Sequence, residues 1–187
     1  MAIAPPRYTE QDLEDVREVT ADRVELLEGE IVVTPAPSPR HQDVVGNLYS
    51  LFRGAIREAG MGVVYIAPLD VVLSEDTIVQ PDVVVVLRDR RPMLTERRIE
   101  GAPSLVVEVM SPTTGVRDVV EKREIYARYG VPEYWLVDPA MFQVTIFTDP
   151  LGDRFRAEQT AIDEVVAQTI PRVSISITEV FSAGPEI

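Results

Sequence analysis

The chain has 187 residues, 45% of them hydrophobic, and no cysteine, which excludes a disulfide-stapled domain, a cysteine zinc site and thiol catalysis. A chain of this length can bury a stable core without a metal or a covalent cross-link. Its 31 acidic and 18 basic residues give a formal charge of −13, which repels polyanions and disfavours a general DNA-coating role.

Hydrophobic periodicity and turn residues predict helices and strands along the whole chain. The expected elements, in chain order, are a helix at 10–19, strands at 24–27 and 30–34, a helix at 39–59, strands at 63–67, 69–73, 82–87 and 104–110, a helix at 116–129, strands at 133–138, 143–147 and around Phe155, and a terminal turn at 178–181. We therefore expect an α/β (α+β) fold in which helices flank a central mixed β-sheet, with an N-terminal β-hairpin.

Nothing in the sequence divides this pattern into parts. No repeat, low-complexity tract or linker interrupts it, so residues 1–187 are expected to form one domain. No apolar run approaches the ~20 residues that a membrane helix needs, and the N-terminal segment lacks the order of a signal peptide. These observations predict a cytoplasmic protein that does not enter a membrane.

The basic residues are almost all arginine: seventeen Arg accompany one lysine, Lys122, and the chain has one histidine, His41. A lysine ammonium is compact and can lose its proton, whereas a guanidinium is a rigid fork of donors that stays charged. Either Lys122 performs a task that arginine cannot, or chance left one lysine in the chain.

Two carboxylates interrupt apolar strands. Asp82 begins the run PDVVVVL, and Glu108 lies inside LVVEVM. An unpaired ionised carboxylate in such a position costs several kcal/mol of desolvation, so each needs a basic group, backbone N–H groups or a divalent cation. Two acids at neighbouring strand ends would suit Mg²⁺, and simple salt bridges at a sheet edge would explain them equally well.

The predicted helix at 116–129 carries a stripe of residues spaced three or four apart: Val119, Lys122, Tyr126 and Tyr129. A lysine on this stripe would reach toward a buried acid, and Glu108 is the nearest candidate in sequence. The alternatives are an ion pair with Asp118 in the same helix, or an amine that extends to water.

A strand that begins with Pro-Asp, a second strand with an inward glutamate 26 positions later and a nearby lysine resemble the PD-(D/E)XK nuclease fold. More specifically, the chain resembles the Uma-two family of restriction-endonuclease-like bacterial proteins in the segments VELLEGEIV, SPRHQDVVGNL, QPDVVVV, LVVEVMSPTT and DVVEKREIYARYGVPEYWLVDP. The similarity runs from about Tyr8 to Phe181. It implies a restriction-endonuclease-like core and a metal-dependent nuclease.

The resemblance implies roles for individual residues. Asp82 and Glu108 match the metal-binding acids, which would hold Mg²⁺ or Mn²⁺, and Lys122 matches the catalytic lysine. In the broader nuclease pattern this lysine follows the acid by two residues on the same strand, but Met110 occupies that position here. The resemblance therefore implies a lysine displaced to the helix.

Two further residues complete the candidate catalytic set. Glu25, in the predicted hairpin, matches an acidic position that such folds use near the metal, and Glu28 and Glu30 are alternatives. His41 lies in the first turn of the long helix, where it would contact a phosphate or relay a proton. A capping or purely structural histidine explains that position equally well.

This set suffices for phosphodiester hydrolysis, because the acids would hold the metal while Lys122 orients the attacking water or neutralises the scissile phosphate. The loop between the two acid-bearing strands offers a basic patch for a nucleic-acid backbone, or else a solvated surface, through Arg88, Arg90, Arg91, Arg97 and Arg98. We therefore expect a Mg²⁺-dependent endodeoxyribonuclease.

Other enzyme classes lack their motifs: the sequence has no P-loop, dinucleotide-binding or nucleophile-elbow pattern, and one histidine cannot build a His-rich metal site. The remaining alternative is a catalytically silent, nuclease-like interaction module, which the charge of −13 favours. Metal binding separates the two hypotheses. Because a double-strand cut needs two sites, the nuclease hypothesis also predicts a homodimer.

Overall fold

The computed structural model describes residues 7–111 and 116–182. Its helices are α1 (Glu10–Arg17), α2 (Pro39–Arg53), α3 (Val116–Arg128) and α4 (Ile177–Val180), with a π-helical turn at Gly54–Glu58 and a 3₁₀ turn at Arg88–Met93. Its strands are β1 (Arg23–Leu27), β2 (Glu30–Thr34), β3 (Gly62–Ile66), β4 (Val71–Ser74), β5 (Thr77–Val79), β6 (Val83–Leu87), β7 (Ile99–Glu100), β8 (Leu105–Val109), β9 (Glu133–Asp138), β10 (Gln143–Leu151), β11 (Arg154–Ala161), β12 (Glu164–Val166) and β13 (Ser174–Ser176).

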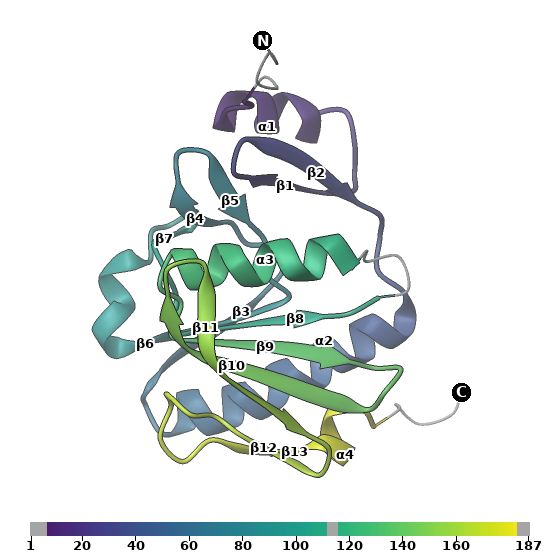
Figure 1. Cartoon of the computed structure of the whole chain (residues 1–187), viewed down its shortest axis with the longest axis vertical. Coiled ribbons are helices and arrows are strands. Elements are labelled where there is room, and N and C mark those ends of the chain that lie inside the picture. Colours follow the sequence, from purple (N-terminus) through teal and green to yellow (C-terminus); the bar gives the residue numbers. More distant parts are fainter. Residues whose placement is uncertain (1–6, 112–115, 183–187) are drawn as a thin grey trace.

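The strands form two main sheets (Figure 1). The larger has the order β11-β10-β9-β8-β6-β3; its β8–β9 pair is parallel and its other pairs are antiparallel. The smaller has the order β2-β1-β5-β4-β7 and contains the N-terminal hairpin. A short pair, β12 and β13, lies near the C-terminal end. The predicted mixed sheet with flanking helices and an N-terminal hairpin is confirmed.

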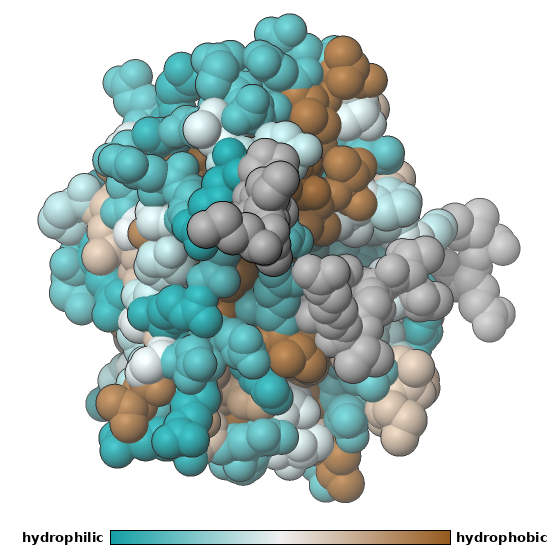
Figure 2. Space-filling model, turned by 45° about the horizontal axis from the view of Figure 1, so that its top comes forward, coloured by the Kyte–Doolittle hydropathy of each residue, from teal (hydrophilic) through white to brown (hydrophobic). Residues whose placement is uncertain are grey.

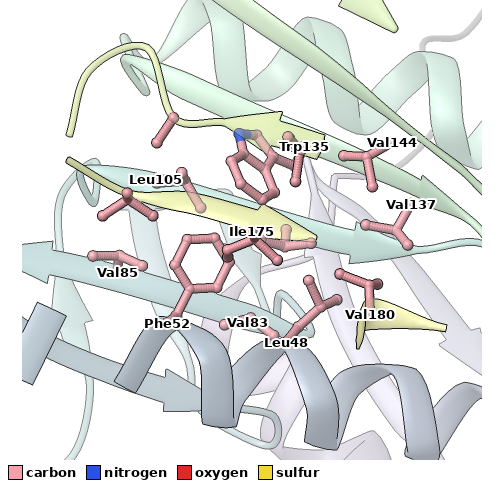
Figure 3. Close-up of a cluster of buried hydrophobic side chains, with 14 of the residues drawn as sticks. Leu48, Phe52, Val83, Val85, Leu105, Trp135, Val137, Val144, Ile175 and Val180 are labelled. Atoms are coloured by element: carbon pink, nitrogen blue, oxygen red, sulfur yellow. The ribbon is translucent and has the colours of Figure 1, made fainter. Parts of the chain in front are cut away.

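Helix α2 covers one face of the six-stranded sheet. Its start is fixed by Ser38, whose side chain accepts from the His41 backbone N–H, and by Pro39 in the first turn. Leu48 and Phe52, one turn apart, pack against Trp135 and the β-branched residues of the sheet, as Figure 3 shows. This is the larger of the main apolar clusters among the described residues.

Helix α3 lies between the two sheets (Figure 1). Ile125 and Tyr126 join a second buried cluster, which draws valines from β6 and β8 on one side and residues of β1, β4 and β5 on the other. The buried side of α3 therefore packs against residues of both sheets. This arrangement gives the middle of α3 access to residues that are distant in sequence.

The tight hairpin β1–β2 turns at Glu28 and Gly29, which have φ values of 49° and 84°. Positive φ at both central residues is what a two-residue hairpin requires, and glycine adopts it without strain. The turn sets the register Leu27↔Glu30 and Glu25↔Val32. It thereby fixes the face of the strand on which Glu25 lies.

The structure differs from the sequence prediction mainly in how the strands are divided between sheets. The single expected sheet is two sheets, because the hairpin pairs with β5 and not with the central strands. The short strands β5, β7, β12 and β13, of two or three residues each, carry too little alternation to be recognised. The sequence Ser111-Pro112-Thr113 is typical of a helix start and would open the predicted helix at 116–129, but it falls partly on residues 112–115, outside the described residues.

Hydrophilic residues cover most of the face shown in Figure 2, with a few separate hydrophobic areas. Within the described residues, no helix is both long and apolar enough to cross a membrane.

The buried carboxylate of Glu133 anchors the segment that follows β12. It accepts from the Trp135 indole N–H at 2.6 Å, from the Gln168 and Thr169 backbone N–H groups at 3.0 and 2.7 Å, and from the Thr169 hydroxyl at 2.6 Å. Each donor would lose a charged acceptor if the carboxylate were replaced.

We expect Glu133→Gln to lower the free energy of unfolding by about 2 kcal/mol, because the NH2 group of the glutamine would face groups that are themselves hydrogen-bond donors. Urea denaturation measures this change. Glu164→Gln, at an exposed glutamate of β12, is the matched control and should change stability by less than about 0.5 kcal/mol. Equal stability of the two variants would contradict the anchoring role of Glu133.

Candidate active site

The two sequence-predicted acids lie side by side in the six-stranded sheet. Strands β6 and β8 are antiparallel neighbours with Val83 opposite Val107, so Asp82 and Glu108 occupy the next positions at the same end of the pair. Both side chains are buried, with 2% of Asp82 and 8% of Glu108 exposed. The prediction that they lie on adjacent strands is confirmed.

Lys122 reaches across from α3 to two acids. Its ammonium donates to Glu108 Oε1 at 3.0 Å and contacts Glu25 Oε2 at 2.8 Å. The side chain is buried, so the alternative in which the amine extends to water is wrong. The Asp118 side chain of the other alternative lies outside the described residues. The prediction that the single lysine faces a buried acid is confirmed.

The hairpin supplies Glu25 and not one of its acidic neighbours. Glu25 is buried and also accepts from the Gln80 backbone N–H at 2.7 Å, which links β1 to the segment before Asp82. Glu28 instead pairs with Arg128, and Glu30 is exposed. The contacts of Glu25 make it a residue that positions Lys122.

Asp82 is held by three donors from three parts of the chain. Arg23 Nη2 donates to Oδ1 at 2.6 Å, the Val109 backbone N–H donates to Oδ2 at 2.8 Å, and His41 Nε2 lies 3.2 Å from Oδ2. An ionised carboxylate only accepts, so Nε2 of His41 carries the proton in this contact. The other ring nitrogen, Nδ1, is buried and has no hydrogen-bond partner in the described part of the chain.

The charges in the site do not balance. Three carboxylates, Glu25, Asp82 and Glu108, face two fixed cations, Arg23 and Lys122. The cluster therefore has one negative charge left when His41 is neutral. A buried excess of negative charge is unfavourable unless a further cation or a proton compensates it.

Burial and neighbouring groups shift the pKa values of the two strand acids, Asp82 and Glu108, in opposite directions. Burial opposes ionisation of Asp82, but the His41 hydrogen bond and the Arg23 charge outweigh it and lower its pKa to about 2. Burial is the main cause of the raised pKa of Glu108. The charges of Asp82 and Glu25 raise this pKa further, and those of Lys122 and Arg23 lower it without cancelling the rise. Of these two acids, Glu108 is therefore the one whose ionisation is disfavoured.

Lys122 itself stays protonated. Burial alone would lower its pKa, but the charges of Glu108 and Glu25 outweigh burial and raise it. A lysine in this state can donate hydrogen bonds and stabilise negative charge, but it is not a general base near neutral pH. One turn further along α3, the Tyr126 hydroxyl donates to the same Glu108 oxygen at 2.6 Å.

The donor chemistry of Asp82 and Glu108 fits a hard divalent cation such as Mg²⁺, which prefers carboxylate oxygens and keeps several waters. The excess negative charge of the cluster favours the same ion. Among the described residues, no three His, Asp or Glu side chains form a complete ligand set. A cation would therefore rely on two carboxylates, with water or substrate oxygens as its remaining ligands.

The arginine-rich loop is not part of this site. It follows β6 at Arg88, whereas Asp82 precedes β6, so a strand about 17 Å long separates them. Arg90 donates to the Ala102 carbonyl at 2.6 Å, and Arg98 pairs with Glu10 and Glu100. Contact with nucleic acid stays a prediction for the five arginines of this loop, Arg88, Arg90, Arg91, Arg97 and Arg98. The structure does not place the loop near Asp82 and Glu108.

Sequence reasoning missed two members of the site. Arg23 lies two residues before Glu25 and therefore shares its face of β1. Tyr126 lies four residues after Lys122 and therefore shares its side of α3, where it binds Glu108. In both cases the spacing in the sequence, two residues in a strand and four in a helix, indicates that the residue shares a face with a predicted site residue.

Comparison with known proteins finds a matching family model and a solved structure of similar fold. The Uma2 family model, whose description is "Putative restriction endonuclease", matches residues 10–178. The chain is also similar to the crystal structure of a "putative nuclease belonging to DUF820" from Anabaena variabilis, with a TM-score of 0.74, 20% identity, and coverage of 90% of this chain and 96% of that chain. At this identity the likeness shows a shared fold, and it confirms the predicted nuclease-like core. No curated protein matches the sequence.

Proposed function

This chain belongs to the Uma2 family, and from that membership and the geometry of the site we propose that it is a metal-dependent endonuclease that hydrolyses phosphodiester bonds in DNA. The observation that carries the proposal is the position of Lys122, which links Glu25 of one sheet to Glu108 of the other. These groups, together with Asp82, line a cavity of about 270 Å³.

The protein groups in this cavity have separable tasks. Asp82 and Glu108 would hold Mg²⁺ or Mn²⁺, which when bound lowers the pKa of a water ligand and stabilises charge on the phosphate. Lys122 keeps its proton and presents it to the attacking water or to a phosphate oxygen. In the hydrolysis the water oxygen bonds to phosphorus, the bond from phosphorus to the oxygen of the leaving strand breaks, and one proton of the water passes to that leaving oxygen.

Arg23 and His41 both act on Asp82. Both bind its carboxylate, so they fix its orientation at the junction of β6 and β8. Arg23 also lines the cavity, where its guanidinium can contact a substrate phosphate. These two residues are positioning residues for the acid.

Nicking of supercoiled plasmid DNA tests the proposal. We expect nicking with Mg²⁺ or Mn²⁺, none with chelator, and none for Asp82→Ala or Glu108→Ala. Asp43→Ala, which removes an exposed acid of α2 outside the site, should behave as the wild type. Undiminished nicking by the Asp82 and Glu108 variants would identify a contaminant and contradict the proposal.

The alternative of a silent interaction module makes a different prediction for the metal. A module that does not cut need not bind Mn²⁺, whereas the nuclease must bind it through Asp82 and Glu108. Calorimetric titration of Mn²⁺ into the wild type and Asp82→Ala separates the two.

The homodimer also stays a prediction, and light scattering that gives the mass of one chain would contradict it.

A further inference from the structure

Two cavities meet at Asp82. The first, of about 270 Å³, is the one already described over Glu108 and Lys122. The second, of about 340 Å³, extends to the other side, toward Gln80 and Gln42. Six residues line both: Arg23, Pro35, Ala36, Pro37, His41 and Asp82. The acid and its bound arginine therefore lie between two adjoining hollows.

The two cavities differ in chemistry. Beyond the charged groups, the first is walled by apolar side chains that are only partly buried, among them Val32, Val119 and Leu136. The second is lined by two side-chain amides, those of Gln80 and Gln42, and by the Thr20 hydroxyl, whereas no amide side chain is among the described residues that line the first. An apolar wall suits the flat face of a nucleobase, whereas amides and hydroxyls suit a sugar and its phosphate.

The depth of the acids limits what can reach them. Asp82 is 2% exposed and Glu108 is 8% exposed, and the segment 35–37 lies along the wall of both cavities. A cavity of about 270 Å³ is at the lower edge of the ~300–1,000 Å³ range of small-molecule pockets. It has room for one small organic group, but a base that stays paired and stacked in a duplex cannot enter it.

Electrostatics point the same way. The chain has a formal charge of −13, and its arginine-rich loop lies at the far end of β6, so the site offers few contacts to a duplex backbone. Duplex DNA carries about one negative charge per 1.7 Å, twice the density of one of its strands. An unpaired base in an apolar cavity instead contributes binding energy that does not depend on basic residues.

We propose that the substrate segment is an unpaired DNA strand, in which one base occupies the apolar cavity over Val32, Val119 and Leu136 and the scissile phosphate lies at Asp82 and Arg23. The neighbouring nucleotide then extends into the cavity beside Gln80. This inference rests on the proposed nuclease function and specifies its substrate class.

Adjacent valines provide matched variants. Val32 lines the apolar cavity, whereas Val33, the next residue of β2, points to the other face and is 48% exposed. Val119 and Val120 of α3 form a second pair, with Val119 in the cavity wall and Val120 38% exposed. Val32→Trp and Val119→Trp fill the cavity, and Val33→Trp and Val120→Trp are their controls. If one cavity variant fails to fold, as judged by circular dichroism, the other still tests the proposal.

Cleavage rates are compared for a labelled strand, the same strand in a full duplex, and that duplex with an unpaired loop. With wild-type protein and Mg²⁺ or Mn²⁺, we expect the strand and the loop to be cut at least about tenfold faster than the duplex. Val32→Trp and Val119→Trp should remove this preference, and the two controls should keep it. Binding of a fluorescein-labelled strand, measured by anisotropy in the presence of chelator, should be weaker for Val32→Trp and Val119→Trp than for the wild type and the two controls.

The outcomes are distinct. Equal cleavage of strand and duplex would overturn the inference and leave the nuclease function standing. Cleavage that prefers the strand but is unchanged in both cavity variants would also overturn it, because the base would then lie elsewhere. Absence of metal-dependent cleavage of every substrate would overturn the proposed function and the inference together.

Discussion

Lys122→Met is expected to lower the free energy of unfolding by about 3–5 kcal/mol and to reduce DNA cleavage by more than about 10²-fold. Lys122 is buried and bridges Glu25 and Glu108, so its loss leaves two buried carboxylates without their shared cation. The unpaired negative charge in the cluster rises from one to two. Chemical denaturation at pH 7 measures the stability change, and plasmid nicking measures the catalytic loss.

Two further variants show whether the amine or only its charge matters. Lys122→Arg keeps the charge, but its planar fork cannot match two carboxylates that a compact ammonium bridges. It should retain more stability than Lys122→Met while losing most of the activity. Arg128 lies on the same helix as Lys122 and forms an exposed ion pair with Glu28 of the hairpin turn. Arg128→Met should lower the free energy of unfolding by less than about 1 kcal/mol. If Lys122→Met were no less stable than Arg128→Met, the bridge would have no energetic role.

Glu108→Gln is expected to have the opposite effect on stability and a similar effect on activity. The amide removes the excess negative charge of the cluster while it keeps the size of the side chain, so stability at pH 7 should rise. Cleavage should fall by more than about 10²-fold, because a neutral amide is a weak ligand for Mg²⁺ and the second metal-binding carboxylate is lost. Stability lost to function in this way is common at active sites.

The pH dependence tests the cause of this difference. The pKa of Glu108 is raised by burial above its usual 4.5, so the folded protein binds this proton more tightly than the unfolded chain does. The contribution of Glu108 to stability is therefore fully present below about pH 4.5 and is lost as the pH rises through the folded pKa. Wild type and Glu108→Gln should have similar melting temperatures at pH 4 and diverge toward pH 8, with the variant higher. A variant that melts below the wild type at pH 8 would contradict this account.

A matched control is available on α3. Glu124 is exposed, so Glu124→Gln should show no divergence from the wild type over the same pH range. A divergence of equal size in this variant would show that the effect comes from the overall charge of −13 and not from Glu108.

Local sequence patterns were enough to predict the longer helices and strands and the three groups at the centre of the site. Alternating apolar residues marked the strands, and an acid inside an apolar strand had to be paired, which singled out Asp82 and Glu108. Helical periodicity placed Lys122 on the inward stripe of α3. These signals are local, since each depends only on residues within one element.

Contacts between elements that are distant in the chain depend on the folded structure and not on any local pattern. The pairing of β1 with β5 brought Glu25 to Lys122 and Arg23 to Asp82, which are separated by 97 and 59 positions in the chain. The antiparallel pairing of β6 with β8 put the arginine-rich loop at the end opposite to the acids. The cavities on either side of Asp82 likewise belong to no single segment. Strand pairing and packing between sheets join residues that no local period relates, so they had to be seen in the folded chain.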